Sequence, residues 1–127
     1  MNITQDFGNA TYLIRGYDAH EIRINDSSYT RSVLITPDFL DSEWPPQRVE
    51  EIATKHIEAI AALKPEVVVL GTGAKIKFPA REISHFFLER GVGVEIMDTP
   101  AACRTYNILM SEGRNVAAGL IVGEADG

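Results

Sequence analysis

The hydrophobic pattern along the chain changes character about a third of the way in. Up to residue 36, apolar positions come in short runs such as His20-Glu21-Ile22-Arg23-Ile24, which alternates with period two. Period two is typical of a half-buried strand, and short polar turns between such runs favour antiparallel neighbours. The pattern therefore predicts a meander of strands at residues 11–15, 20–24 and 30–36.

From residue 47 onward, the pattern alternates between helix and strand. Apolar residues three and four positions apart predict a helix over residues 47–64, with His56 on its apolar face and Lys64-Pro65 at its end. The unbroken run Val67-Val68-Val69-Leu70 predicts a strand that is buried on both faces. The same reasoning places helices at 79–90 and 100–112 and strands at 92–97 and 115–122.

Strands joined by helices favour parallel pairing with right-handed connections. We therefore expect a single three-layer α/β domain over residues 1–122, in which a mixed central sheet combines the N-terminal antiparallel meander with a following α-β-α-β-α-β order. Residues 123–127 are expected to form a flexible acidic tail. The loop over residues 37–46 carries Phe39 and Trp44, which we expect to pin it to the body of the protein.

Composition narrows the functional classes. The 127 residues include 12 basic and 18 acidic side chains, which gives a net charge of −6. A nucleic-acid binder needs a basic surface, so no nucleic-acid partner is expected. Cys103 is the single cysteine, the first residues lack a signal-peptide pattern, and no apolar run is long enough to span a bilayer. We therefore expect a cytoplasmic protein that is not membrane-spanning.

Two segments are predicted to meet at the carboxyl edge of the sheet, where open α/β sheets bind ligands. Gly71-Thr72-Gly73 follows one strand, and the helix start at Thr99-Pro100 follows the next, with Thr99 as expected N-cap and Pro100 at the first helical position. Free amides and the helix dipole favour an anion there, and Arg104 adds a cation. The candidate ligand-binding residues are Gly71, Thr72, Gly73, Thr99, Ala102, Cys103, Arg104, Thr105 and Asn107.

The same groups also have a purely structural interpretation. Thr99 then only caps the helix, Arg104 pairs with Asp98 or Glu95, and Asn107 hydrogen-bonds a loop. Both interpretations stay open at this point, because a cap and an anion site use the same backbone groups.

Catalysis is weakly indicated. Gly71-Thr72-Gly73 lacks the further glycine or the Gly-Lys-Ser/Thr of nucleotide-binding loops. Cys103 would have a lowered pKa beside a helix N-terminus and Arg104, yet no histidine accompanies it in the sequence, so a packed cysteine is the favoured interpretation. We assign no catalytic residue, no metal site and no cofactor. The three histidines, none at metal-ligand spacing from another, are His20, His56 and His85.

Several motifs together carry a family resemblance. They are Gly71-Thr72-Gly73, Gly91-Val92-Gly93-Val94-Glu95, the run from Asp98 to Asn107, and Glu112-Gly113-Arg114. With them the chain resembles a family of small α/β domains of unassigned chemistry that includes the mitochondrial NADH:ubiquinone oxidoreductase (complex I) assembly factor 3 and bacterial relatives. The resemblance implies a three-layer fold and a non-catalytic role in binding assembly and subunit proteins.

We therefore expect a bacterial, non-enzymatic protein-interaction or assembly-factor-like module. Its expected partners are proteins, with membrane-complex assembly components as candidates, and the sheet edge and the 39–44 loop are its candidate contact surfaces. The alternative is a protein that binds a small anionic ligand, or an enzyme that uses Cys103 and Arg104 at the Thr99 helix start. A homo-oligomer formed through an exposed sheet edge is a third hypothesis.

Overall fold

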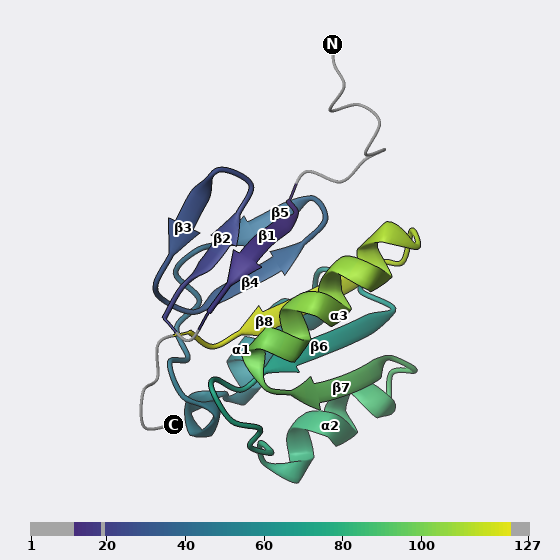
Figure 1. The fold of residues 1–127 in the computed structure, drawn as a ribbon. Helices are drawn as coiled ribbons and strands as arrows, with labels where there is room; N and C mark the ends of the chain where they lie inside the picture. Colours follow the sequence, from purple (N-terminus) through teal and green to yellow (C-terminus); the bar gives the residue numbers. More distant parts are fainter. Residues whose placement is uncertain (1–11, 19, 123–127) are drawn as a thin grey trace.

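The protein is described by a computed structural model over residues 12–18 and 20–122 (Figure 1). The expected tail at 123–127 and the start of the first expected strand lie outside these residues. Within them, a five-stranded sheet has the order β5-β4-β8-β6-β7, and a separate three-stranded sheet has the order β1-β2-β3. The strands of the larger sheet are β4 (Val33–Thr36), β5 (Phe39–Asp41), β6 (Val67–Gly71), β7 (Gly93–Met97) and β8 (Val116–Leu120).

The larger sheet is mixed, as predicted. β6 pairs in parallel with both β7 and β8, so that Val68 lies opposite Val94 on one side and Ala117 on the other. β8 then pairs antiparallel with β4, and β4 pairs antiparallel with β5. The mixed α/β fold is thus confirmed, with β6 near its centre.

Two hydrophobic cores lie on opposite faces of the large sheet, and the central strands contribute side chains to both. Val67 and Val69 face one core, while Val68 and Leu70 face the other. The first core is covered by α3 (Thr99–Ser111), which crosses in front of the sheet in Figure 1, and the second by α1 (Thr54–Ala61) and α2 (Arg81–Leu88). Burial on both faces explains the unbroken apolar run of β6, because both sets of alternating side chains leave water.

The N-terminal meander is divided between the two sheets. β1 (Ile14–Tyr17), β2 (Ile22–Ile24) and β3 (Ser27–Tyr29) form the small antiparallel sheet, and the predicted strand 30–36 contributes only β4, which joins the large sheet. Ile22 and Ile24 are buried against the α3 side, as their alternation with exposed Arg23 predicts. Alternation identifies the buried face of a strand, but it does not identify the sheet that the strand joins.

The predicted helix 47–64 was wrong in its length. The structure has a short 3₁₀ helix η2 (Val49–Glu51) followed by α1, and between them Ile52 and Ala53 are extended, with ψ of 116° and 172°. His56 fixes this break, because its Nδ1 accepts the Ala53 N–H at 2.9 Å. The break still lets Val49 and Ile52 reach the same core as Ile57, which explains why the apolar spacing looked continuous.

Trp44 pins the loop before η2, whereas Phe39 does not. Trp44 is only 2% exposed and its backbone N–H donates to the Ser32 carbonyl, but Phe39 lies in β5 and is 39% exposed. The indole lies directly on Gly119 of β8, where a Cβ atom would come within 2.6 Å of Trp44 Cη2. Only a glycine leaves room for the ring at this point of the sheet.

We expect Gly119→Ala to lower the free energy of unfolding by about 1–3 kcal/mol, because the added methyl overpacks the indole. Urea denaturation measures the change. Gly93→Ala is the matched control, since its Cβ would meet only Val67 Cγ2 at 3.8 Å. Equal stability of the two variants would contradict this account of the Trp44 contact.

Candidate functional site

Thr99 joins the two segments that the sequence predicted to meet. Its Oγ1 accepts the Gly73 N–H at 2.8 Å and donates to the Ile121 carbonyl at 2.7 Å. Its own N–H donates to the Gly73 carbonyl at 2.9 Å. The carboxyl end of β6, the start of α3 and the residue after β8 are therefore connected through one buried hydroxyl.

The helix start is satisfied by the protein itself. Asp98, not Thr99, is the N-cap, and its Oδ1 accepts the Ala101 N–H at 2.8 Å. The prediction that Thr99 caps the helix and that Pro100 occupies its first position was wrong, because α3 begins at Thr99 itself. A carboxylate of the chain therefore already lies where a bound anion would be favoured.

Gly71 lets α3 approach the sheet closely. A Cβ atom at this position would lie 2.9 Å from Thr99 Oγ1 and 3.0 Å from the Ala102 Cβ. Ala102 is fully buried. Direct contact between helix and strand thus occupies the space between the two predicted segments.

Thr72 shapes the loop that follows β6. Its buried hydroxyl donates to the Lys75 carbonyl at 2.7 Å and accepts the Lys77 N–H at 3.0 Å. Its backbone N–H donates to the Met97 carbonyl. Thr72 therefore holds the loop at both residue 75 and residue 77.

Cys103 is a packed side chain in the core beneath α3. It is fully buried, and this burial raises the pKa of its thiol to about 12, against the smaller lowering effect of Arg104. The lowered pKa expected for an activated thiolate was wrong, since desolvation of the charged form outweighs the helix terminus and the neighbouring cation.

Two of the remaining predicted residues, Arg104 and Asn107, attach the small sheet to α3. Asn107 Nδ2 donates to the Ile14 carbonyl at 2.7 Å, while its Oδ1 accepts the Ile14 N–H at 3.2 Å. Arg104 is exposed and donates to the Tyr17 hydroxyl at 3.1 Å, not to the expected Asp98 or Glu95, and this bond raises the pKa of Arg104. Thr105 Oγ1 lies 3.3 Å from the Met97 sulfur.

A groove between α1 and α2 was missed by sequence reasoning. It has a volume of about 620 Å³, with an apolar floor that includes Ile52, Ile57 and Phe86 and a rim that carries Glu82 and Glu89. The helical periodicity identified these apolar side chains as inward-facing. Only the packing of the two helices shows that the groove between them stays open.

His56 lies in the core beside Trp44, where its pKa is lowered. Its ring meets the Trp44 ring edge-on at 6.3 Å between centroids, and burial together with Lys55 lowers the pKa of His56. Because Nδ1 accepts a hydrogen bond, the neutral ring carries its proton on Nε2. The predicted hydrogen-bonded core histidine is thus confirmed.

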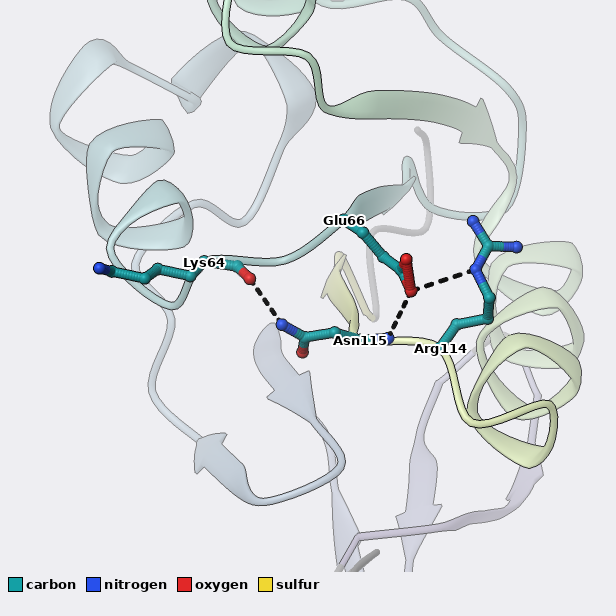
Figure 2. A network of polar contacts seen from close by, with 4 residues as sticks. All are labelled: Lys64, Glu66, Arg114 and Asn115. Atoms are coloured by element: carbon teal, nitrogen blue, oxygen red, sulfur yellow. Dashed lines mark hydrogen bonds and ion pairs between the residues drawn. The ribbon is translucent and has the colours of Figure 1, made fainter.

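A polar network closes the opposite end of the sheet (Figure 2). Glu66 Oε2 accepts from Arg114 Nε at 3.2 Å and from the Asn115 N–H at 3.1 Å, while Asn115 Nδ2 donates to the Lys64 carbonyl. The Glu66 and Arg114 side chains are about half exposed, so the ion pair contributes little to stability. Its main effect is to align the starts of β6 and β8.

We expect Thr99→Val to lower the free energy of unfolding by about 2–4 kcal/mol, because the Gly73 N–H and the Ile121 carbonyl both lose a buried partner. Thr99→Ser keeps the hydroxyl and should cost about 1 kcal/mol through its missing methyl. Urea denaturation of both variants measures the difference. Equal losses would show that the hydroxyl does not hold the junction.

Comparison with known proteins places the chain in a family. Residues 14–121 match the family described as "Protein of unknown function (DUF498/DUF598)". The chain belongs to this family. Over 95% of this chain it is 32% identical to the zebrafish "NADH dehydrogenase [ubiquinone] 1 alpha subcomplex assembly factor 3", of which it covers 70%. A Francisella tularensis relative named "13 kDa major membrane protein" is 27% identical, with 95% of this chain and 99% of that protein covered.

Solved structures of bacterial relatives share the fold. The NMR structure of a Xanthomonas campestris protein is 40% identical with a TM-score of 0.82, covering 89% of this chain and 86% of that one. A Bordetella parapertussis crystal structure is 37% identical with a TM-score of 0.83, covering 91% and 98%. A Bordetella pertussis structure described as an Mth938-like domain is 30% identical with a TM-score of 0.76, covering 91% and 89%.

The described residues contain neither a membrane-spanning helix nor a metal-binding cluster. None of their helices has the length and apolar character needed to cross a membrane. No group of three or more histidine, cysteine or acidic side chains among them is arranged to hold a metal ion.

Proposed function

We propose that this protein is an assembly-factor-like module that binds other proteins through the groove between α1 and α2. Its relationship to the zebrafish assembly factor, over 70% of that protein, supports the general role. The single observation that carries the proposed surface is the open groove, with a floor of Ile52, Ile57 and Phe86. Apolar floors with polar rims are the usual anatomy of protein interfaces.

The charge of the groove favours a basic partner. Its rim carries the exposed carboxylates Glu82 and Glu89. A fitting partner is a protein segment that inserts an apolar side chain into the floor and places lysine or arginine beside the rim, because opposite charges set orientation and association rate. Components of membrane complexes, met from outside the bilayer, are the candidate partners.

The polar groups at the predicted sheet edge already bind one another within the fold, which supports a binding surface elsewhere. The Thr99 hydroxyl uses both hydrogen bonds within the chain, Asp98 caps α3, and the Cys103 thiol has its pKa raised to about 12. These groups therefore serve the fold. A binding role in preference to a catalytic one is consistent with that use.

We expect Glu82→Lys/Glu89→Lys to reduce partner recovery at least about tenfold, because two attractive contacts at the rim become repulsive. Affinity purification from the native host, quantified by mass spectrometry, measures recovery. Glu95→Lys/Glu112→Lys is the matched control, since it reverses two exposed carboxylates outside the groove. Recovery of no specific protein by the wild-type chain would overturn the proposal.

A small anion at Arg104 is the second candidate function. The observation that favours it is the exposed Arg104 guanidinium, which donates to the Tyr17 hydroxyl and forms no ion pair with a carboxylate of the described residues. Such a site would lie on the outer side of α3, beside β1. It would use Arg104 from the predicted set and leave the closed Thr99 junction intact.

If this second function holds, inorganic phosphate will raise the melting temperature of the wild-type chain and Arg104→Ala will abolish the rise. Sulfate and chloride at equal ionic strength control for general salt effects. Arg31→Ala, which removes an exposed arginine between β3 and β4, is the matched variant. A rise that persists in Arg104→Ala would eliminate this site.

The predicted homo-oligomer is tested separately, by light scattering of the same samples.

A further inference from the structure

The loop between β6 and α2 exposes two large apolar side chains. Phe78 is 71% exposed and Ile76 is 49% exposed. Phe78 has the highest exposure among the large hydrophobic residues in the described part of the chain. Leaving a phenylalanine ring in water forgoes the free energy of its burial, so a position this open is informative about what covers it.

The same loop is a basic region of an acidic protein. The loop (residues 72–80) and the first residue of α2 contain Lys75, Lys77 and Arg81 and no aspartate or glutamate, although the whole chain has a net charge of −6. Within the described residues, no ion pair joins these three cations to a carboxylate. Their charge is therefore available to an anionic surface.

The loop is held in shape before it meets a partner. The buried Thr72 hydroxyl bonds to the backbone of residue 75 and of residue 77, on either side of Ile76. These bonds hold in place the alternation of cationic and apolar residues from Lys75 to Phe78. Because the backbone is already ordered, little conformational entropy is lost on binding.

We propose that this loop docks the protein on an anionic phospholipid surface. Phe78 and Ile76 enter the boundary between headgroups and acyl chains, while Lys75, Lys77 and Arg81 pair with lipid phosphates. Long basic side chains extend their charge to the headgroups while apolar neighbours insert, which makes this combination typical of peripheral membrane contact. Projecting apolar side chains suit a fluid surface, which adapts its shape around them without a complementary groove.

The acidic remainder of the protein limits the contact to this loop. Apart from these three cations the chain has 18 acidic and 9 basic side chains, so anionic lipids repel the net charge of the remainder. Two apolar side chains and three cations give reversible, salt-sensitive attachment, not permanent anchoring. This contact uses residues other than the α1–α2 groove, so either proposal can fail without the other.

Vesicle flotation tests the proposal with the full chain. In 50 mM NaCl the protein should float with vesicles of 70% phosphatidylcholine and 30% phosphatidylglycerol, should remain unbound with pure phosphatidylcholine, and should be released at about 500 mM NaCl. Lys75→Gln/Lys77→Gln should weaken partitioning about fivefold per lysine. Phe78→Ser should weaken it at least about tenfold, because the inserted ring is lost.

Two control variants separate the loop from general surface chemistry. Leu88→Ser removes a side chain that is 60% exposed on α2, and Lys55→Gln removes an exposed cation on α1. Both should float as the wild type does, and circular dichroism should show native spectra for every variant. Absence of flotation on anionic vesicles at 50 mM NaCl, or wild-type flotation of the loop variants, overturns the proposal. Loss of a captured protein in the loop variants without any vesicle binding also overturns it and assigns the loop to a protein partner.

Discussion

The hydroxyl of Thr99 is the interaction on which the arrangement of this protein depends. It lies in the first turn of α3, accepts a hydrogen bond from Gly73 after β6 and donates one to Ile121 after β8. Gly71 supplies the space for this contact, since any side chain there would collide with Thr99. One buried group thus sets the position of α3 over the two central strands, and α3 in turn holds the small sheet through Asn107.

This junction determines which groups remain available for binding. A helix start beside a glycine loop is the usual place for a ligand in an open α/β sheet, and here the same backbone groups bind one another. Asp98 supplies the negative charge that the helix start favours, and the buried Cys103 has a raised pKa. The side chains available for binding lie on the surface, in the groove between α1 and α2, at Arg104, and in the loop that Thr72 shapes.

Sequence patterns located most elements to within two residues, because burial imposes period two on strands and near-four on helices. α2 and α3 follow the helical period, whereas β6 and β8 are buried on both faces and appear as unbroken runs of apolar or small residues. The pattern failed where a local hydrogen bond overrode it: His56 binds the Ala53 N–H and divides the predicted first helix. It also failed at β3 and β4, where neighbouring residues in the chain enter different sheets. The β-propensity of a segment does not determine which sheet it joins.

The sequence by itself determined the mixed α/β fold, the meeting of the 71–73 and 99–107 segments, and the placement of Trp44 and Cys103 among packed residues. These follow from local spacing and from the cost of leaving apolar side chains in water. Only the tertiary structure decided that Asp98 caps α3, that Thr99 closes the predicted edge, and that Phe78 stands exposed while the α1–α2 groove remains open. Each of these depends on distances between residues remote in the chain, and the burial pattern of a single element does not encode such distances.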